Sequence, residues 1–280
     1  MIKRIAASIL PGLLKHVPRN IKVLYPFYLA GQLDVAEETH HSPALPEAFD
    51  GLTLAYASDI HFGPLFTPAQ ATALYETLLG MKTDLLILGG DFGDVLANSI
   101  RFFELIPAFP EHLKVFAVLG NHDYGKRNEP VAPLLSAMRM KNVIPLVNQC
   151  QAIVRDGKRL LVCGPDDFRC GRPDFAPLIA EVLEDDFVLF IPHSPDVLPQ
   201  ADREGFRYHL ALCGHTHGGQ IVLFGRSLHS SSIYKDRYRS GWYKEGGQDI
   251  LVSNGVGTSI LPMRLGTRPQ VHKLYLRTQL

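Results

Sequence analysis

The stretch LTLAYASDIH, residues 52–61, joins an apolar run to an aspartate and a histidine that are two residues apart. An apolar run of this length that ends at a small residue is typical of a buried β-strand. Residues i and i+2 of an extended chain point to the same side, so Asp59 and His61 are expected to project together. The stretch therefore predicts a buried strand that delivers two polar side chains at its carboxyl end.

Two more apolar runs of strand length follow, at residues 85–90 and 115–120. Stretches with helical spacing separate the three runs, at residues 67–81 and 99–109. Strands that alternate with helices usually pair in parallel, and their ligands bind at the carboxyl ends of the strands. We therefore expect an α/β fold with its chemistry at one edge of a sheet.

The second half of the chain is richer in strands, with seven apolar runs of strand length and one plain helical pattern. No repeat, low-complexity tract or long linker divides the two halves, so one domain is expected over residues 50–280. Residues 1–49 are expected to form an amphipathic arm and a lead-in. Within the lead-in, residues 35–51 are predicted to be irregular, with His40 and His41 in solvent.

Composition limits the classes of function. The chain has 28 basic and 28 acidic residues, so its net charge does not indicate a nucleic-acid partner. An apolar content of 46% and a charged content of 20% are typical of a soluble globular protein. The cysteines show no C-x-x-C spacing, which favours free thiols, a reducing compartment and a cytoplasmic location. They are Cys150, Cys163, Cys170 and Cys213.

Residues 1–22 differ from the rest, because they hold five basic residues, no acidic residue and apolar positions with roughly helical spacing. The apolar run at residues 5–14 is too short to span a bilayer, and no A-x-A cleavage site follows it. A basic amphipathic stretch binds an anionic membrane surface, which would make the protein peripheral on the inner membrane. The alternative is an arm that docks on the domain's own core. Both interpretations stay open.

Five apolar runs end in aspartate, asparagine or histidine, in most cases beside a glycine. Taken singly, each polar residue is explained as a turn or cap residue, but coincidence is a poor explanation for five in order. The motifs are D-x-H at 59–61, D-x-x-D at 91–94, N-H-D at 121–123, the histidine at 193 and H-x-H at 215–217.

This ordered set strongly resembles the calcineurin-like metallophosphoesterase family over roughly residues 50–275. The segments HSPD, GHTHGGQI and SNGVGTSILPMRLGTRPQVHKLYL are similar to the bacterial YkuE-like branch of that family. The resemblance implies a four-layer αββα sandwich, with two mixed β-sheets flanked by helices. It also relates the chain to calcineurin-like hydrolases that cleave UDP-2,3-diacylglucosamine.

The resemblance implies two divalent metal ions. Oxygen and imidazole ligands suit manganese, iron or zinc, and manganese is favoured. One ion would be held by Asp59, His61, Asp91 and His217. The other would be held by Asp91, Asn121, His193 and His215, with Asp91 bridging the two.

The resemblance further implies that His122 contacts the phosphoryl oxygen or protonates the leaving group, oriented by Asp123. Asp94 is expected either to orient a metal ligand or to cap a helix. Loops after two later strands hold candidate substrate contacts, although a solvated surface side chain is the simpler interpretation of each. These are Arg169, Arg172, Tyr238 and Trp242.

We therefore expect a dimetal hydrolase of phosphodiester or pyrophosphate bonds that acts by attack of a metal-bridging hydroxide on phosphorus. The substrate would be a phosphorylated small molecule or a lipid-linked phosphate. One alternative is hydrolysis of the pyrophosphate of UDP-2,3-diacylglucosamine in lipid A synthesis. A second is a non-catalytic metal-binding scaffold, which is disfavoured because every ligand residue of the family pattern is present.

Overall fold

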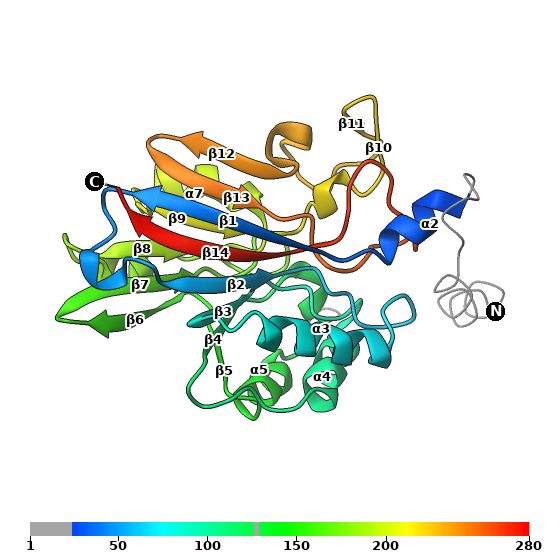
Figure 1. Cartoon of the computed structure of the whole chain (residues 1–280), viewed down its shortest axis with the longest axis horizontal. Coiled ribbons are helices and arrows are strands. Elements are labelled where there is room, and N and C mark those ends of the chain that lie inside the picture. The colour runs from blue at the N-terminus through cyan, green and yellow to red at the C-terminus, as the bar shows by residue number, and fades with distance from the viewer. Residues whose placement is uncertain (1–23, 126–128, 280) are drawn as a thin grey trace.

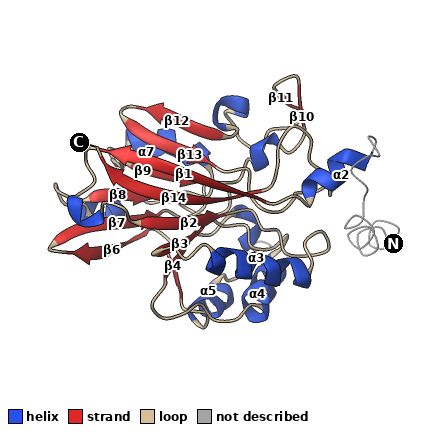
Figure 2. Ribbon diagram, viewed as in Figure 1, coloured by secondary structure: helices blue, strands red, loops and turns tan. Residues whose placement is uncertain are grey.

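A computed structural model describes residues 24–125 and 129–279 of the chain. Two six-stranded sheets lie face to face, and helices cover their outer faces (Figures 1 and 2). The predicted αββα sandwich is therefore confirmed.

Both sheets are mixed. The first, in spatial order, contains β1 (Asp34–Ser42), β14 (Gln270–Thr278), β2 (Thr53–Ala57), β3 (Leu85–Leu88), β4 (Lys114–Ala117) and β5 (Val143–Pro145). The second contains β12 (Gly241–Glu245), β13 (Gln248–Val252), β9 (Leu210–Cys213), β8 (Phe187–Phe190), β7 (Lys158–Gly164) and β6 (Gln149–Arg155). A separate hairpin joins β10 (Val222–Leu223) to β11 (Arg226–Ser227).

The helices divide between the two outer faces. The first sheet is covered by α3 (Pro68–Gly80), α4 (Leu96–Leu105) and α5 (Ala132–Arg139). The second sheet is covered by α6 (Ala176–Glu181) and α7 (Leu198–Arg203). A short helix, α2 (Tyr25–Ala30), lies at the end of the molecule where the described chain begins (Figure 1).

The central strands read as continuous apolar runs because both of their faces are covered. In β2, Leu54 and Tyr56 pack between the two sheets, whereas Ala55 and Ala57 pack under the helices of the first sheet. This two-residue alternation within an all-apolar strand is what a four-layer sandwich requires.

The two helices predicted in the first half are present. Thr67 caps α3 through a capping box with Gln70, which fixes its start as predicted. The second helix, α4, begins three residues before the predicted position and ends at Leu105. It ends early because Pro107 disfavours helical backbone in the residue before it, and Ile106 is extended.

The lead-in predicted as irregular contains β1, so that prediction is wrong. Nine residues of β1 pair in parallel with β14 at the edge of the first sheet. No local pattern indicates this strand, because its partner is more than 200 residues away and its own side chains are mostly polar. His40 is also buried, contrary to expectation: its Nε2 lies 3.0 Å from Asp249 Oδ2.

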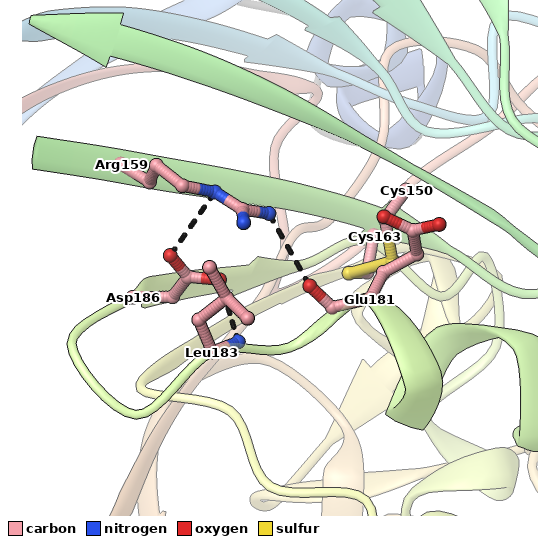
Figure 3. The surroundings of a disulfide bond; sticks show 6 residues. All are labelled: Cys150, Arg159, Cys163, Glu181, Leu183 and Asp186. Carbon is pink, nitrogen blue, oxygen red and sulfur yellow. Dashed lines mark hydrogen bonds and ion pairs between the residues drawn. A yellow bond between two sulfur atoms is a disulfide. The ribbon is translucent and has the colours of Figure 1, made fainter. Parts of the chain in front are cut away.

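Two cysteines are joined, so the prediction of four free thiols is wrong. Cys150 in β6 lies opposite Cys163 in β7, and antiparallel pairing brings them together as a disulfide (Figure 3). Beside the bond, Arg159 pairs with Asp186 at 3.3 Å. The expected reducing compartment and cytoplasmic location rested on free thiols, and that support is lost.

Among the described residues, no helix is both long and apolar enough to cross a membrane. The amphipathic arm predicted for residues 1–22 lies outside the described residues.

Candidate metal centre

The carboxyl ends of β2, β3 and β4 in one sheet meet those of β8 and β9 in the other. Six of the seven predicted ligand residues have ligand atoms in close groups at this edge. The groups are Asp59, His61 and His217; His61, Asp91 and His122; and Asp91, His193 and His215. The seventh, Asn121, directly precedes His122, whose backbone amide donates to Asp91 Oδ1 at 2.8 Å.

The distances between ligand atoms suit shared ions. Nε2 of His61 and Nε2 of His217 are 3.0 Å apart, and the latter is 3.5 Å from Asp59 Oδ1. Asp91 Oδ2 lies 3.6 Å from His61 Nε2 and 3.3 Å from His193 Nε2. Ligand atoms that share an ion at about 2.0–2.1 Å lie roughly 3.3 Å apart in tetrahedral geometry. Asp91 is thus common to two groups, as a bridging ligand would be.

Hydrogen bonding leaves metal-binding atoms free. His193 Nδ1 lies 2.7 Å from the carbonyl of Gly89, which can only accept, so Nδ1 carries a proton and the lone pair of the neutral ring is on Nε2. His193 Nε2 and Asn121 Oδ1 are buried without a hydrogen-bond partner among the described residues. Because unpaired buried polar atoms are costly, these two fit ligands of a cation.

Five of the expected ligands have left-handed backbone, which is rare outside glycine. Asp59, His61, Asp91, His215 and His217 have φ of 55°, 50°, 55°, 69° and 53°. Such conformations cost about 1–3 kcal/mol each and collect at functional sites. Here they turn the chain sharply at strand ends, which brings alternate side chains to one point.

The glycines beside the ligands allow close approach of the backbone. A Cβ on Gly120 would lie 2.3 Å from Asp91 Oδ1, and one on Gly214 would lie 2.4 Å from Asp59 Oδ2. Any larger residue at either position would displace a carboxylate.

Burial sets the protonation of the imidazoles. It lowers the pKa of His61 to about 4 and that of His215 to about 3, and it holds the pKa of His217 well below the usual range. His193 and Asp91 differ, because their mutual interaction outweighs the effect of burial: it raises the pKa of His193 and keeps the pKa of Asp91 well below the usual value. Neutral imidazoles and an ionised carboxylate are the forms that bind metals.

His122 stands beside the ligands and is only partly buried. Its ring meets that of His61 edge-on, with 4.8 Å between centroids. Its Nδ1 lies 2.9 Å from the backbone carbonyl of Asp94. The backbone carbonyl of Asp94 therefore orients the His122 ring, while its carboxylate accepts from the Asn98 side chain at 2.6 Å. The alternative role of Asp94 as a helix cap is wrong, because Val95 is the N-cap of α4.

The expected pair of His122 with Asp123 is not formed. A single 3₁₀ turn, Asn121–Asp123, directs the Asp123 carboxylate into the protein. There it accepts from the backbone amides of Asp91 at 2.7 Å, Phe92 at 2.9 Å and Gly120 at 2.9 Å. Asp123 therefore holds the loop that carries Asp91.

Of the four candidate substrate contacts, two are bonded within the protein and two are exposed on a loop. Tyr238 is buried and its hydroxyl donates to Glu245 at 2.7 Å, so its predicted contact with substrate is wrong. Trp242 donates to Glu38 at 3.0 Å and stacks on His40, which ties it to β1. Arg169 and Arg172 lie exposed on the loop after β7.

One residue of the site, Arg264, was not predicted. Its guanidinium is fully buried and donates to the backbone carbonyls of His217 at 3.0 Å, Asn254 at 2.8 Å and Gly255 at 3.1 Å. It thereby fixes the turn that carries His217. No local pattern in the sequence distinguishes this arginine from an exposed one.

We expect Arg264→Met to destabilise the protein by about 3 kcal/mol or more, because buried carbonyls lose a charged donor. Metal content should fall with it, since the turn at His217 is freed. Denaturant unfolding and metal analysis measure both effects. Arg268→Met is the matched control, because Arg268 is exposed. Wild-type stability and metal content in Arg264→Met would contradict the role.

Comparisons with known proteins identify a matching family and similar sequences. A model of the calcineurin-like phosphoesterase family matches residues 52–219. The uncharacterized metallophosphoesterase YkuE of Bacillus subtilis is 28% identical over 251 residues, covering 88% of this chain and 86% of that protein. The phosphodiesterase YaeI of Escherichia coli is 29% identical over 233 residues, covering 80% of this chain and 81% of its own. A putative 5'-nucleotidase structure from Staphylococcus aureus aligns with a TM-score of 0.47 at 11% identity, covering 75% of this chain and 49% of that one.

Proposed function

The chain belongs to the calcineurin-like phosphoesterase family, and we propose that it hydrolyses phosphodiester or pyrophosphate bonds with a two-metal centre. The observation that carries the proposal is the position of Asp91. Its Oδ2 lies within 3.6 Å of His61 Nε2 and 3.3 Å of His193 Nε2, so one carboxylate faces both groups of ligand atoms. The similarity to the relative named phosphodiesterase YaeI supports a phosphodiester as the substrate.

We assign the ligands as the sequence predicts. Asp59, His61 and His217 would complete one site with Asp91, and Asn121, His193 and His215 the other. When bound, two dications supply positive charge that stabilises a phosphoryl group and lowers the pKa of water. Oxygen and imidazole ligands suit manganese, iron or zinc, and we propose manganese.

His122 would act on the leaving group. The Asp94 carbonyl can only accept a hydrogen bond, so Nδ1 of His122 carries a proton and Nε2 is the nitrogen that exchanges one with the substrate. Partial exposure lets the ring reach a bound phosphoester.

A lipid-linked substrate, such as the pyrophosphate of UDP-2,3-diacylglucosamine, is the second candidate. A cavity of about 170 Å³ beside His217 is lined by Ile221, Leu228 and Ile260, which suits an apolar group attached to the phosphate. Binding of residues 1–22 to an anionic membrane would bring such substrates near, and it rests on their sequence alone.

Metal analysis with a substrate panel tests the proposal. We expect two ions per chain, and faster hydrolysis of bis(p-nitrophenyl) phosphate and of a nucleotide pyrophosphate than of p-nitrophenyl phosphate. Chelation should remove the activity, and manganese should restore more of it than zinc or iron. Undiminished hydrolysis by the metal-free protein would refute the two-metal centre, and a preference for the monoester would refute the substrate class.

A further inference from the structure

Large apolar side chains lie beside the His217 turn of the metal centre and are exposed to solvent. Phe224, at the tip of the β10–β11 hairpin, is fully exposed, and Ile260 is 84% exposed. Exposed apolar groups scattered singly are normal, but a cluster beside an active site marks a binding surface. We call the cluster the apolar collar; it consists of Leu223, Phe224, Leu228, Ile260 and Leu261.

The two segments of the apolar collar are fixed to each other and to the metal centre. Gln220, which directly follows the 3₁₀ turn His217–Gly219, accepts from the Ser259 amide at 2.9 Å. The same side chain donates to the carbonyl of Leu261 at 3.0 Å. The hairpin is therefore held beside the 259–261 loop, one turn away from a metal ligand.

Two exposed residues of the apolar collar have left-handed backbone. Phe224 and Ile260 have φ of 50° and 64°, in the left-handed region that bulky and β-branched residues disfavour. At Phe224 the hairpin accounts for this conformation, because the two-residue turn Phe224–Gly225 has positive φ at both residues. The hairpin also stands out from the ends of the sheets, so its tip can meet a flat surface (Figure 1).

The charges around the apolar collar identify its partner. Residues 220–240 contain four basic residues and one acidic residue. Arg226 and Lys235 are exposed and form no ion pair within the described part of the chain. A second copy of the chain would bring the same positive charges together, whereas anionic phospholipids offer apolar depth under a negative surface.

The start of the described chain lies at the same end. The carbonyl of Pro26, in α2, accepts from the Arg264 amide at 2.9 Å, three residues beyond Leu261 of the apolar collar. The described chain therefore begins beside this surface.

We propose that the apolar collar docks the protein on an anionic lipid bilayer, with Phe224 and Ile260 inserted and the metal centre facing the membrane. The docking goes beyond the proposed hydrolysis and does not depend on it. Only the expectation that the substrate is a membrane lipid rests on the proposed hydrolysis.

Vesicle binding of the full-length chain tests the docking. The vesicles contain two parts phosphatidylcholine to one part phosphatidylglycerol, and high salt screens the attraction of residues 1–22. We expect Phe224→Ser/Ile260→Ser to weaken vesicle binding at least about tenfold, because two large apolar side chains no longer insert. Met140→Ser, which changes an exposed apolar residue directly after α5, is the matched control and should bind as wild type does.

A fluorescence measurement locates the inserted residue. In Phe224→Trp, the emission should shift to the blue on vesicles and be quenched by brominated lipid, whereas Met140→Trp should show neither effect. The natural tryptophan, Trp242, is subtracted with the wild-type protein. No blue shift at position 224 while the chain binds vesicles would overturn the proposal. Self-association that protects Phe224→Trp without lipid would assign the apolar collar to a second copy and also overturn it.

Hydrolysis of soluble bis(p-nitrophenyl) phosphate separates this proposal from the proposed function. The single variant Phe224→Ser should keep the wild-type rate, because Phe224 lies at the hairpin tip and belongs neither to the ligand groups nor to the lining of the cavity beside His217. If the wild type hydrolyses the diester but ignores vesicles, the docking fails and the hydrolase stands. If the wild type binds vesicles through position 224 but hydrolyses nothing, the docking stands and the proposed function fails.

Discussion

Replacing Asp91 with asparagine is expected to abolish hydrolysis and to lower the metal content of the protein. Both carboxylate oxygens of Asp91 are engaged: Oδ2 faces His61 and His193, and Oδ1 accepts from the His122 amide. A neutral amide removes the negative charge that two cations would share. Since such ions contribute several kcal/mol to transition-state stabilisation, we expect kcat/KM for a diester to fall about 10³-fold or more.

Metal analysis of Asp91→Asn should show fewer than two ions per chain. Asp185→Asn is the matched control, because Asp185 is exposed in the turn before β8 and its change should leave activity and metal unaltered. Two retained metals together with wild-type activity in Asp91→Asn would exclude the bridging role.

Replacing His122 with asparagine is expected to lower kcat by roughly 10²–10⁴-fold, the scale of general acid catalysis, without loss of metal. The asparagine amide can still donate to the carbonyl of Asp94, so the backbone around Asp91 should be preserved. The loss should be smaller for an ester of nitrophenol than for an alkyl ester, because a good leaving group needs no proton.

The control for this variant is His229→Asn, which changes an exposed histidine outside the ligand groups. Steady-state rates across a series of leaving groups and metal analysis measure the effect. An equal loss for good and poor leaving groups would argue against acid catalysis. Loss of one metal would instead make His122 a ligand.

The motif placed Asp123 correctly in the sequence but did not predict which groups its carboxylate contacts. The resemblance placed it behind His122, yet its carboxylate accepts three backbone amides and the Ser99 hydroxyl. Adjacent residues on a tight turn point in different directions, so neighbours in sequence need not be partners in space. Burial raises the pKa of Asp123 to about 7, while these hydrogen bonds oppose the shift.

The sequence by itself determined the apolar strands, the kinds of ligand and the edge at which they meet. These features depend on local periodicity and on parallel pairing, which places the carboxyl ends of strands side by side. Asp59 and His61 do share one group of ligand atoms, although left-handed backbone rather than extended chain brings them together, and His215 and His217 fall in two neighbouring groups. The ligands of the two proposed ions, in contrast, were implied by the resemblance to the family and not by spacing.

Only the tertiary structure decided the contacts between distant segments. His61 and His217 come within 3.0 Å although 156 residues separate them, and Arg264 reaches the His217 turn from 47 residues away. The polar strand β1, the Cys150–Cys163 disulfide and the burial of Tyr238 likewise depend on partners that no local pattern names. A side chain is buried by the residues that pack over it, and those residues can lie anywhere in the sequence.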